Sequence, residues 1–300
     1  MSNKILILGS TGFIGSEIFK RISLNRDYKV YRYSTKLDRP IDFFETKKAK
    51  FDVIIFASGI HGDIIKYKNI FIENKKILKI LSKLLKSTTK CIFISSFKTS
   101  IETNKQIIKE ENIYNFFKND SDYGKIKILA EKIGIKLFKK YKINYKIISP
   151  SHVIGPSKVK NNPNNIDILK KQRKLINIVP NCFLSFIDVR DVADYILKVI
   201  KNNKFDNKKI ILNTENILYK DYIKKIKKKK FNVIIEINDK LIVFLASIIE
   251  FLTFLIKIKF NFITKFQINY ILTKKVTTIR KDIPRNYNLE TSIKNLLESN

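Results

Sequence analysis

Residues 3–22 constrain the fold of this chain more than any other stretch. Their sequence, NKILILGSTGFIGSEIFKRI, runs from apolar residues through a turn with Gly9, Gly12 and Gly15 into a pattern of helical period. Glycine lets a backbone turn tightly and approach a pyrophosphate, whose charge then lies at the helix N-terminus. Three of the chain's 8 glycines fall in this one turn. A strand, a phosphate-binding turn and a helix are therefore predicted here.

Strand-like and helix-like stretches alternate after this turn. The strand-like runs are 28–34, 51–58, 90–96, 144–151 and 209–215. Amphipathic helical patterns cover 69–86 and 122–141. Such alternation predicts an α/β fold of the Rossmann type, a doubly wound parallel sheet with helices on both faces.

The composition changes in the second half of the chain. Residues 157–180 are polar and rich in Asn, and sequence beyond residue 215 is rich in Lys and helical in pattern. We therefore predict an NAD(P)-binding domain and a smaller C-terminal substrate-binding lobe. The domain covers 1–156 with strands returning around 185–215, and the lobe is formed by 157–184 and 216–300.

The net charge of +33 raises the question of an anionic partner, because 60 Lys and Arg face 27 Asp and Glu. The basic residues are spread along nearly the whole chain, and Lys, Asn and Ile are abundant while Gly and Pro are scarce. This is the bias of an AT-rich coding sequence, and it predicts a solvated basic surface. Nucleic acid is therefore disfavoured as a partner, and small molecules are favoured.

An apolar stretch, LIVFLASIIEFLTFLI at 241–256, leaves three interpretations open. It is shorter than the roughly 20 residues that span a bilayer, and it contains Glu250. The basic run KKIKKKK at 224–230 would attract an anionic membrane leaflet. A buried lid helix is favoured over a helix at the membrane surface, and a true span comes last. Peripheral membrane contact through 224–257 therefore stays open.

The cysteine and histidine counts indicate the cellular setting. Cys91 and Cys182 lie in stretches that read as interior, which suits a reducing cytosol and gives no disulfide framework. His61 and His152 are too isolated for a zinc site, so no metal is predicted. Met1 is followed directly by the strand-like run, without a signal peptide. The expected location is the cytoplasm, with the inner membrane face as an alternative.

Several motifs follow one another over nearly the whole chain in the order of one enzyme family. They are GSTGFIG (9–15), VIIFASG (53–59), FISSFKTS (93–100), SDYGKIKILAEK (121–132), IISPSHVIGP (147–156) and SFIDVRDVADYI (185–196). Together they resemble an extended short-chain dehydrogenase/reductase of the NAD-dependent epimerase/dehydratase family. The last two lean towards the dihydroflavonol-reductase-like or sugar-reductase-like branch.

The resemblance implies a nicotinamide dinucleotide and a set of residues that bind it. These are Gly9, Thr11, Gly12, Phe13, Ile14, Gly15, Asp42, Ala57, Ser58, Asn74, Tyr123, Lys127 and Pro150. Arg32 joins them because it lies about 20 residues after the glycines, where an NAD site has an acid on the adenosine ribose. A cation there favours the 2′-phosphate, so NADP is preferred over NAD.

The resemblance also implies a catalytic set of Ser96, Tyr123 and Lys127. Residues i and i+4 of a helix share a face, so Tyr123 and Lys127 can point together into the cleft at the strand ends. The ammonium favours a phenolate and lowers the pKa of the phenol. Ser96 would orient the substrate oxygen, and Tyr123 would exchange its proton while a hydride moves.

The spacing of Tyr123 and Lys127 recurs twice, so spacing alone does not select them. Tyr114 precedes Lys118 and Tyr270 precedes Lys274 by the same four residues. The first of these copies lacks helical periodicity, and the second lies beyond the last predicted core strand. Tyr123 opens an amphipathic helix 27 residues after Ser96, and it is therefore the predicted acid/base.

The substrate is predicted from departures and from three candidate contacts. His61, His152 and Arg190 are the candidate substrate residues. Phe97 and Lys98 follow Ser96 where the dehydratase branch has an acid pair, which disfavours dehydration. We expect an NAD(P)-dependent reductase or epimerase of a nucleotide-linked sugar. The alternatives are a reductase or dehydrogenase of an apolar or lipid-linked ketone and, last, a non-catalytic binding protein. A homodimer also stays open.

Overall fold

The computed structural model describes most of the chain in separate stretches. These are residues 3–34, 50–58, 78–79, 81–101, 106–110, 122–156, 168, 176–227, 233–238, 240–241, 244, 248 and 274–298. Predictions made for Asp42, His61, Asn74, Tyr114 and Tyr270 lie outside these residues.

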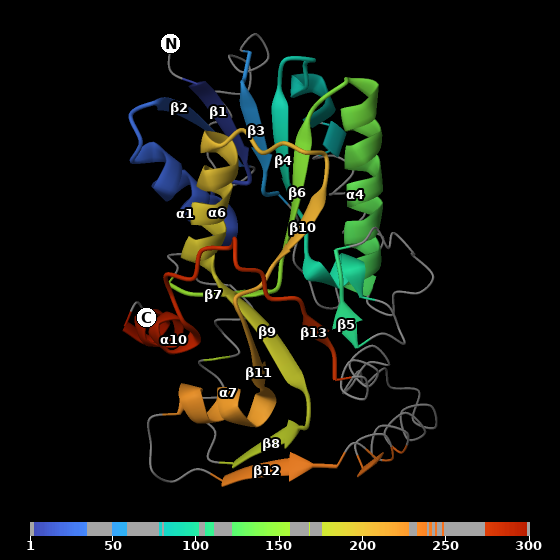
Figure 1. Cartoon of the computed structure of the whole chain (residues 1–300), viewed down its shortest axis with the longest axis vertical. Helices are drawn as coiled ribbons and strands as arrows, with labels where there is room; N and C mark the ends of the chain where they lie inside the picture. Colours follow the sequence, from blue (N-terminus) through green and yellow to red (C-terminus); the bar gives the residue numbers. More distant parts are fainter. Residues whose placement is uncertain are drawn as a thin grey trace.

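A six-stranded parallel sheet forms the centre of the molecule (Figure 1). Its order is β10-β6-β4-β3-β1-β2. The strands are β1 (Asn3–Leu8), β2 (Tyr28–Tyr33), β3 (Val53–Phe56), β4 (Lys90–Ile94), β6 (Tyr145–Pro150) and β10 (Lys209–Leu212). Each of the five strand-like runs predicted after the turn contributes one of them, and the predicted parallel α/β sheet is confirmed.

The buried positions of these strands are largely apolar because both faces of the sheet are covered. In β1, Ile5 and Ile7 belong to one buried cluster, and Leu6 and Leu8 belong to another. Successive side chains of a strand point to opposite faces, so the two clusters are the two sides of the sheet.

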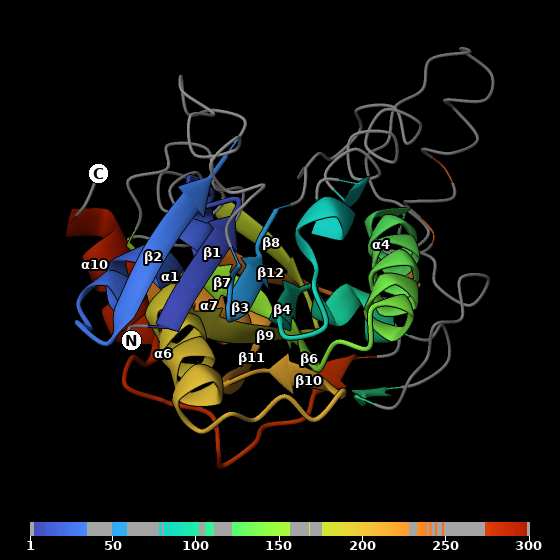
Figure 2. The same cartoon turned by 90° about the horizontal axis from the view of Figure 1, so that it is seen from above.

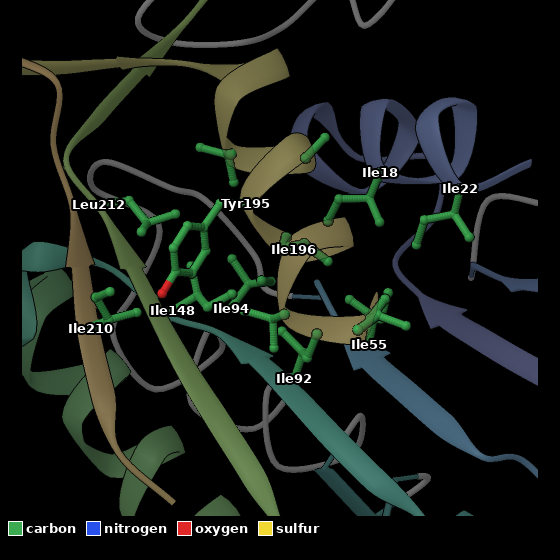
Figure 3. Packing of buried hydrophobic residues seen from close by; sticks show 14 of the residues in the cluster. Ile18, Ile22, Ile55, Ile92, Ile94, Ile148, Tyr195, Ile196, Ile210 and Leu212 are labelled. Atoms are coloured by element: carbon green, nitrogen blue, oxygen red, sulfur yellow. The ribbon is translucent and has the colours of Figure 1, made fainter. Parts of the chain in front are cut away.

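Helices α1 (Phe13–Ser23) and α6 (Val189–Lys201) lie side by side on one face, and α4 (Asp122–Lys140) covers the other (Figures 1 and 2). Figure 3 shows Tyr195 and Ile196 of α6 over the isoleucines of β4 and β6, and Ile18 and Ile22 of α1 near Ile55. The helix predicted over 122–141 is confirmed. In the range 69–86, the described residues 78–79 and 81–84 are helical.

A second lobe lies below the carboxyl ends of the central strands in Figure 1. It contains a three-stranded sheet of β7 (His152–Ile154), β9 (Phe183–Asp188) and β11 (Glu215–Leu218). The strands β8 (Ile176–Pro180) and β12 (Val233–Ile237) pair in parallel, and α7 (Tyr219–Ile226) and α10 (Leu289–Glu298) pack in the same lobe. The short strands β5 (Ile107–Ile108) and β13 (Val276–Thr277) also pair.

The lobe contains more strand than the sequence predicted. The C-terminal third was expected to be helical, yet it contributes β11, β12 and β13. The VIIEI sequence of β12 is rich in β-branched residues, but the Lys-rich flanks hid its period. Of the returning strands, β10 enters the central sheet and β9 enters the second one.

The apolar stretch 241–256 is described at three of its positions. Leu241, Phe244 and Ile248 have helical backbone, lie on one helix face by their spacing, and are exposed. Their exposure does not fit the buried lid helix at these positions. No helix among the described residues is long and apolar enough to cross a membrane.

Candidate active site

The glycine turn lies between β1 and α1 at the carboxyl edge of the central sheet. Gly9 has a φ of +88°, and a Cβ atom there would lie 2.8 Å from the Ala57 carbonyl at the end of β3. A Cβ atom on Gly15 would lie 2.2 Å from the Gly9 oxygen. Both positions therefore require glycine, because α1 begins against the turn and the turn against β3.

The turn is also tied to the end of β2. The Gly9 amide donates to the Tyr33 oxygen over 2.8 Å, and the hydroxyls of Thr11 and Ser34 are hydrogen-bonded. The Ser10 hydroxyl is buried and lacks a hydrogen-bond partner among the described residues. A backbone cradle without filling side chains, opening at a helix N-terminus, fits the pyrophosphate of a dinucleotide.

Arg32 of β2 lies near the same turn. Its guanidinium carbon is 4.2 Å from the ring centroid of Phe19, on α1. Its Nε atom is buried and has no hydrogen-bond partner within the described part of the chain. This placement is compatible with the predicted contact to an adenosine ribose or its phosphate.

Ser96 lies just beyond the end of β4 and caps the short 3-10 helix η1 (Phe97–Ser100). The Ser96 hydroxyl accepts from the Lys98 amide over 3.3 Å, and the Thr99 hydroxyl donates to the Ser96 carbonyl over 2.8 Å. These bonds fix the backbone that carries the Ser96 side chain.

Tyr123 and Lys127 lie in the first turns of α4, and α4 packs against η1. The Lys127 Nζ is 5.8 Å from the centroid of the Tyr123 ring. The Nζ of Lys98, from η1, is 5.4 Å from the same ring. The elements that carry the three predicted catalytic residues are therefore in contact.

Lys127 is buried although it carries a charged group. Burial lowers its pKa from the usual 10.5 to about 8, and the nearby Glu131 carboxylate opposes this by favouring the ammonium. A lysine with such a pKa still carries a proton at neutral pH but releases it readily.

Other predicted cofactor and substrate residues lie on the strands and turns around Ser96 and the glycine turn. Pro150 ends β6, two residues before His152. The His152 ring lies 5.0 Å from the Phe97 ring, next to Ser96, and its Nδ1 is 3.0 Å from the Ser185 oxygen. Phe13, Ile14 and Ala57 pack against the sheet core below the turn.

Arg190, at the start of α6, is held by neighbouring protein groups. Its guanidinium forms two 2.9 Å hydrogen bonds with the buried Asp188 carboxylate and lies 3.5 Å from the Tyr287 ring centroid. These contacts favour a structural role for Arg190.

A group of polar residues behind the site was missed by sequence reasoning. Glu131 and Lys209 form a buried ion pair, and Ser95 and Thr99 are bonded to it. One signal was available, since Glu131 is four residues beyond Lys127 on the same helix face.

Cys91 and Cys182 are buried free thiols, as predicted for interior residues. Among the described residues, no cluster of three or more His, Cys, Asp or Glu could hold a metal ion.

The sequence matches the model of the NAD dependent epimerase/dehydratase family over residues 5–214. The search of curated proteins found no match to this chain. Among solved structures, gox2253 is 17% identical with a TM-score of 0.74, and the match covers 99% of this chain and 98% of that one.

Two further similar structures are sugar-nucleotide epimerases by name. UDP-N-acetylglucosamine 4-epimerase from Bacillus cereus is 13% identical with a TM-score of 0.67, and 99% of both chains is covered. UDP-glucuronic acid 4-epimerase from Bacillus cereus, in complex with NAD, is 16% identical with a TM-score of 0.58, over 78% of this chain and 87% of that one. At these identities the likeness shows a common fold.

Proposed function

From the premise that this chain belongs to the NAD dependent epimerase/dehydratase family, and is thus an NAD(P)-dependent enzyme of the short-chain dehydrogenase/reductase type, we propose that it reduces or epimerises a nucleotide-linked sugar. Hydride transfer would occur at a carbon that alternates between carbonyl and carbinol, with Tyr123 as the acid/base. The epimerases that share this fold support a sugar as substrate.

The observation that carries the proposal is the meeting of α4 with η1. It places the Tyr123 ring 5.4 Å from the Lys98 Nζ of η1, the segment that Ser96 caps, while Lys127 of α4 lies 5.8 Å from the same ring. A phenol with a neighbouring cation can give up and regain a proton near neutral pH, which is what acid/base catalysis at a hydroxyl requires.

The residues would share the work as follows. When bound, the nicotinamide dinucleotide supplies or accepts the hydride. In the reducing direction, the Ser96 hydroxyl would donate a hydrogen bond to the substrate carbonyl and orient it. Tyr123 would transfer its hydroxyl proton to that oxygen as the carbon receives the hydride. The Lys127 ammonium would stabilise the resulting phenolate and bind the nicotinamide ribose.

The cofactor would lie across the glycine turn. Gly9, Gly12 and Gly15 would admit its pyrophosphate to the N-terminus of α1, and Arg32 would contact the adenosine ribose. We favour NADP over NAD because Arg32 is a cation, and its buried Nε has no hydrogen-bond partner among the described residues. The lobe formed by 157–184 and 216–300 would hold the sugar nucleotide.

A direct experiment tests this function. The purified protein is titrated with NADP and NAD by calorimetry, and then incubated with the tighter cofactor and a panel of nucleotide sugars and their 4-keto forms. We expect micromolar cofactor binding and a change in reduced-nicotinamide absorbance, or a new epimer, with one sugar class. Failure to bind either cofactor would sink the enzyme proposal.

A second function is supported by an exposed apolar face of the second lobe. Ile176 and Ile178 of β8 pair with Val233 and Ile235 of β12, and all four side chains are between 46% and 61% exposed. Leu241, Phe244 and Ile248, which follow β12 in the sequence, are exposed as well. With a net charge of +33, the surface would suit an anionic membrane and a lipid-linked ketone or sugar.

Sedimentation with vesicles separates this second function from the first. The variant Ile178→Glu/Ile235→Glu should lose binding to phosphatidylglycerol vesicles that the unaltered chain binds. Leu24→Glu is the matched control, because Leu24 is 74% exposed at the C-terminus of α1, away from the strand pair. Equal sedimentation of all three proteins, or of none, would rule out this face as a membrane contact.

A further inference from the structure

A buried ion pair lies behind the proposed Tyr123 and Lys127 pair. The Lys209 Nζ, from β10, is 3.3 Å from Glu131 Oε2, on α4. Their side chains are 2% and 0% exposed. Removing two charges from water is costly, so such a pair persists only where further hydrogen bonds complete it.

The completing bonds come from the segment that carries Ser96. The Ser95 hydroxyl donates to Glu131 Oε1, and the Lys209 ammonium donates to the Thr99 hydroxyl. Thr99 in turn donates to the Ser96 carbonyl over 2.8 Å. The ion pair therefore joins three elements, α4, β10 and η1, around the backbone of Ser96.

Glu131 also shares a helix face with Lys127. The two residues are four positions apart on α4, where side chains are neighbours. Around Lys127, the described groups are the Tyr123 ring, 5.8 Å from its Nζ, and Glu131, both from α4. Lys98 of η1 lies over the same Tyr123 ring, and Lys209 lies behind Glu131. Glu131 is the one anion among these, so it is the group that favours the charged form of Lys127.

We propose that Glu131 is a positioning residue whose carboxylate, held by Lys209 and Ser95, keeps Lys127 an ammonium and fixes α4 against the Ser96 segment. This inference rests on the proposed function for the roles of Tyr123 and Lys127. Lys209 acts one step further away, because it pairs with the Glu131 carboxylate and so completes the buried link.

The burial of Lys127 shows why such a residue is needed. Its pKa is lowered to about 8 by desolvation even with Glu131 present. Without the carboxylate, desolvation would act unopposed and the pKa would fall further. The protonated share of Lys127 at neutral pH would then fall, although the residue has to be an ammonium to stabilise a phenolate.

A titration of Lys127 tests the proposal without a substrate. Competitive acetylation over a pH series, followed by peptide mass spectrometry, gives the pKa of individual lysines. Glu131→Gln keeps an acceptor for Ser95 but removes the charge. We expect the Lys127 midpoint to fall by about one pH unit, a tenfold change in the protonation ratio. Lys146, which is buried on β6 and paired with Asp206, is the internal reference and should keep its profile.

A double variant separates positioning from stability. Glu131→Gln/Lys209→Met removes both members of the ion pair, so Lys209 is not left as an unpaired buried charge, and this variant should melt at a higher temperature than Glu131→Gln alone. Its Lys127 midpoint should nevertheless stay below that of the unaltered chain. If Glu131→Gln does not fold, the double variant alone decides.

The proposal is overturned if the Lys127 midpoint stays unchanged in Glu131→Gln, or returns fully in the double variant together with stability. The ion pair would then be a purely structural link. Because acetylation requires no turnover, either result is independent of whether Tyr123 is the acid/base. Failure of the proposed function would instead appear as unimpaired turnover in a Tyr123 variant.

Discussion

Lys127 is a buried residue with a charged group, and burial disfavours the charged form of its side chain. Its side chain is removed from water beside Tyr123, yet its proposed work requires an ammonium. In the unfolded chain its pKa is the usual 10.5, whereas in the folded chain it is about 8. Folding therefore releases a proton from Lys127 at pH values between these two.

This difference predicts how stability depends on pH. Between pH 8 and 10.5 the unfolded state binds more protons, so the contribution of Lys127 to stability rises with pH, and below pH 8 its cost is fully present. The cost is on the order of 3 kcal/mol. Without cofactor, Lys127→Met should therefore be more stable than the unaltered chain at pH 7, and this advantage should shrink towards pH 10.

Urea unfolding of both proteins at pH 7, 9 and 10 measures this advantage. Tyrosine ionisation at high pH affects both proteins and cancels in the difference. An advantage that is the same at all three pH values would contradict the assigned shift of Lys127.

Arg32 gives a second prediction at the scale of one residue. A hydrogen-bonded contact with a phosphate contributes about 1.5–3 kcal/mol, so Arg32→Ala should weaken NADP binding about 10- to 100-fold. Binding of NAD should change little. Arg26→Ala, an exposed position before β2, is the matched control in the same calorimetric titration. An unchanged preference for NADP over NAD would remove Arg32 from the cofactor site.

Among the elements, the unit of β1, the glycine turn and α1 is the most tightly specified. Gly15 cannot carry a Cβ atom, because the Gly9 carbonyl lies 2.2 Å from the position that it would take. Gly15→Ala should therefore cost about 3 kcal/mol of unfolding free energy and weaken cofactor binding.

Gly134→Ala on α4 is the matched control for this change. Its added Cβ would meet side chains alone, the Phe93 ring at 3.1 Å and the Phe138 ring at 3.6 Å, and alanine favours the helix. Urea unfolding should give a small change for this variant. Equal losses in the two variants would show that the backbone contact at Gly15 is not the cause.

The central strands could be predicted from sequence because their physics is simple. A strand that is buried on both faces is apolar at nearly every position, as β3 is throughout and β4 is after Lys90. Strand β12 follows no such rule, because Ile234 faces α7 and the core while Val233 and Ile235 are exposed. Its apolar residues on both sides, in a basic surrounding, gave no readable period.

In the candidate site, too, residues marked by a local sequence pattern could be predicted, and residues that meet only in the folded chain could not. Ser96, Tyr123 and Lys127 could be proposed from sequence because each follows a recognisable element in a fixed order. The Glu131 and Lys209 pair could not, because its partners are 78 residues apart and meet only through the position of β10 in the sheet. A lysine in an apolar strand gives no sign of its partner.

In the whole molecule, the two lobes divide the proposed work. The central sheet presents the glycine turn, Ser96 and α4 at its carboxyl edge, and the second lobe lies beyond that edge (Figure 1). Ligands of open α/β sheets bind in this position. The exposed face of β8 and β12 lies in the second lobe. A membrane or a second copy of the chain that covered this face would leave the glycine turn accessible.

The proposal that Tyr123 is the acid/base is tested most directly by Tyr123→Phe, which removes one hydroxyl. We expect cofactor affinity to stay nearly unchanged, while turnover of the sugar identified in the panel falls about 1,000-fold. Tyr141→Phe, directly after α4, and the sequence copies Tyr114→Phe and Tyr270→Phe should retain turnover. A Tyr123→Phe enzyme that turns over at the rate of these controls would contradict the proposed mechanism.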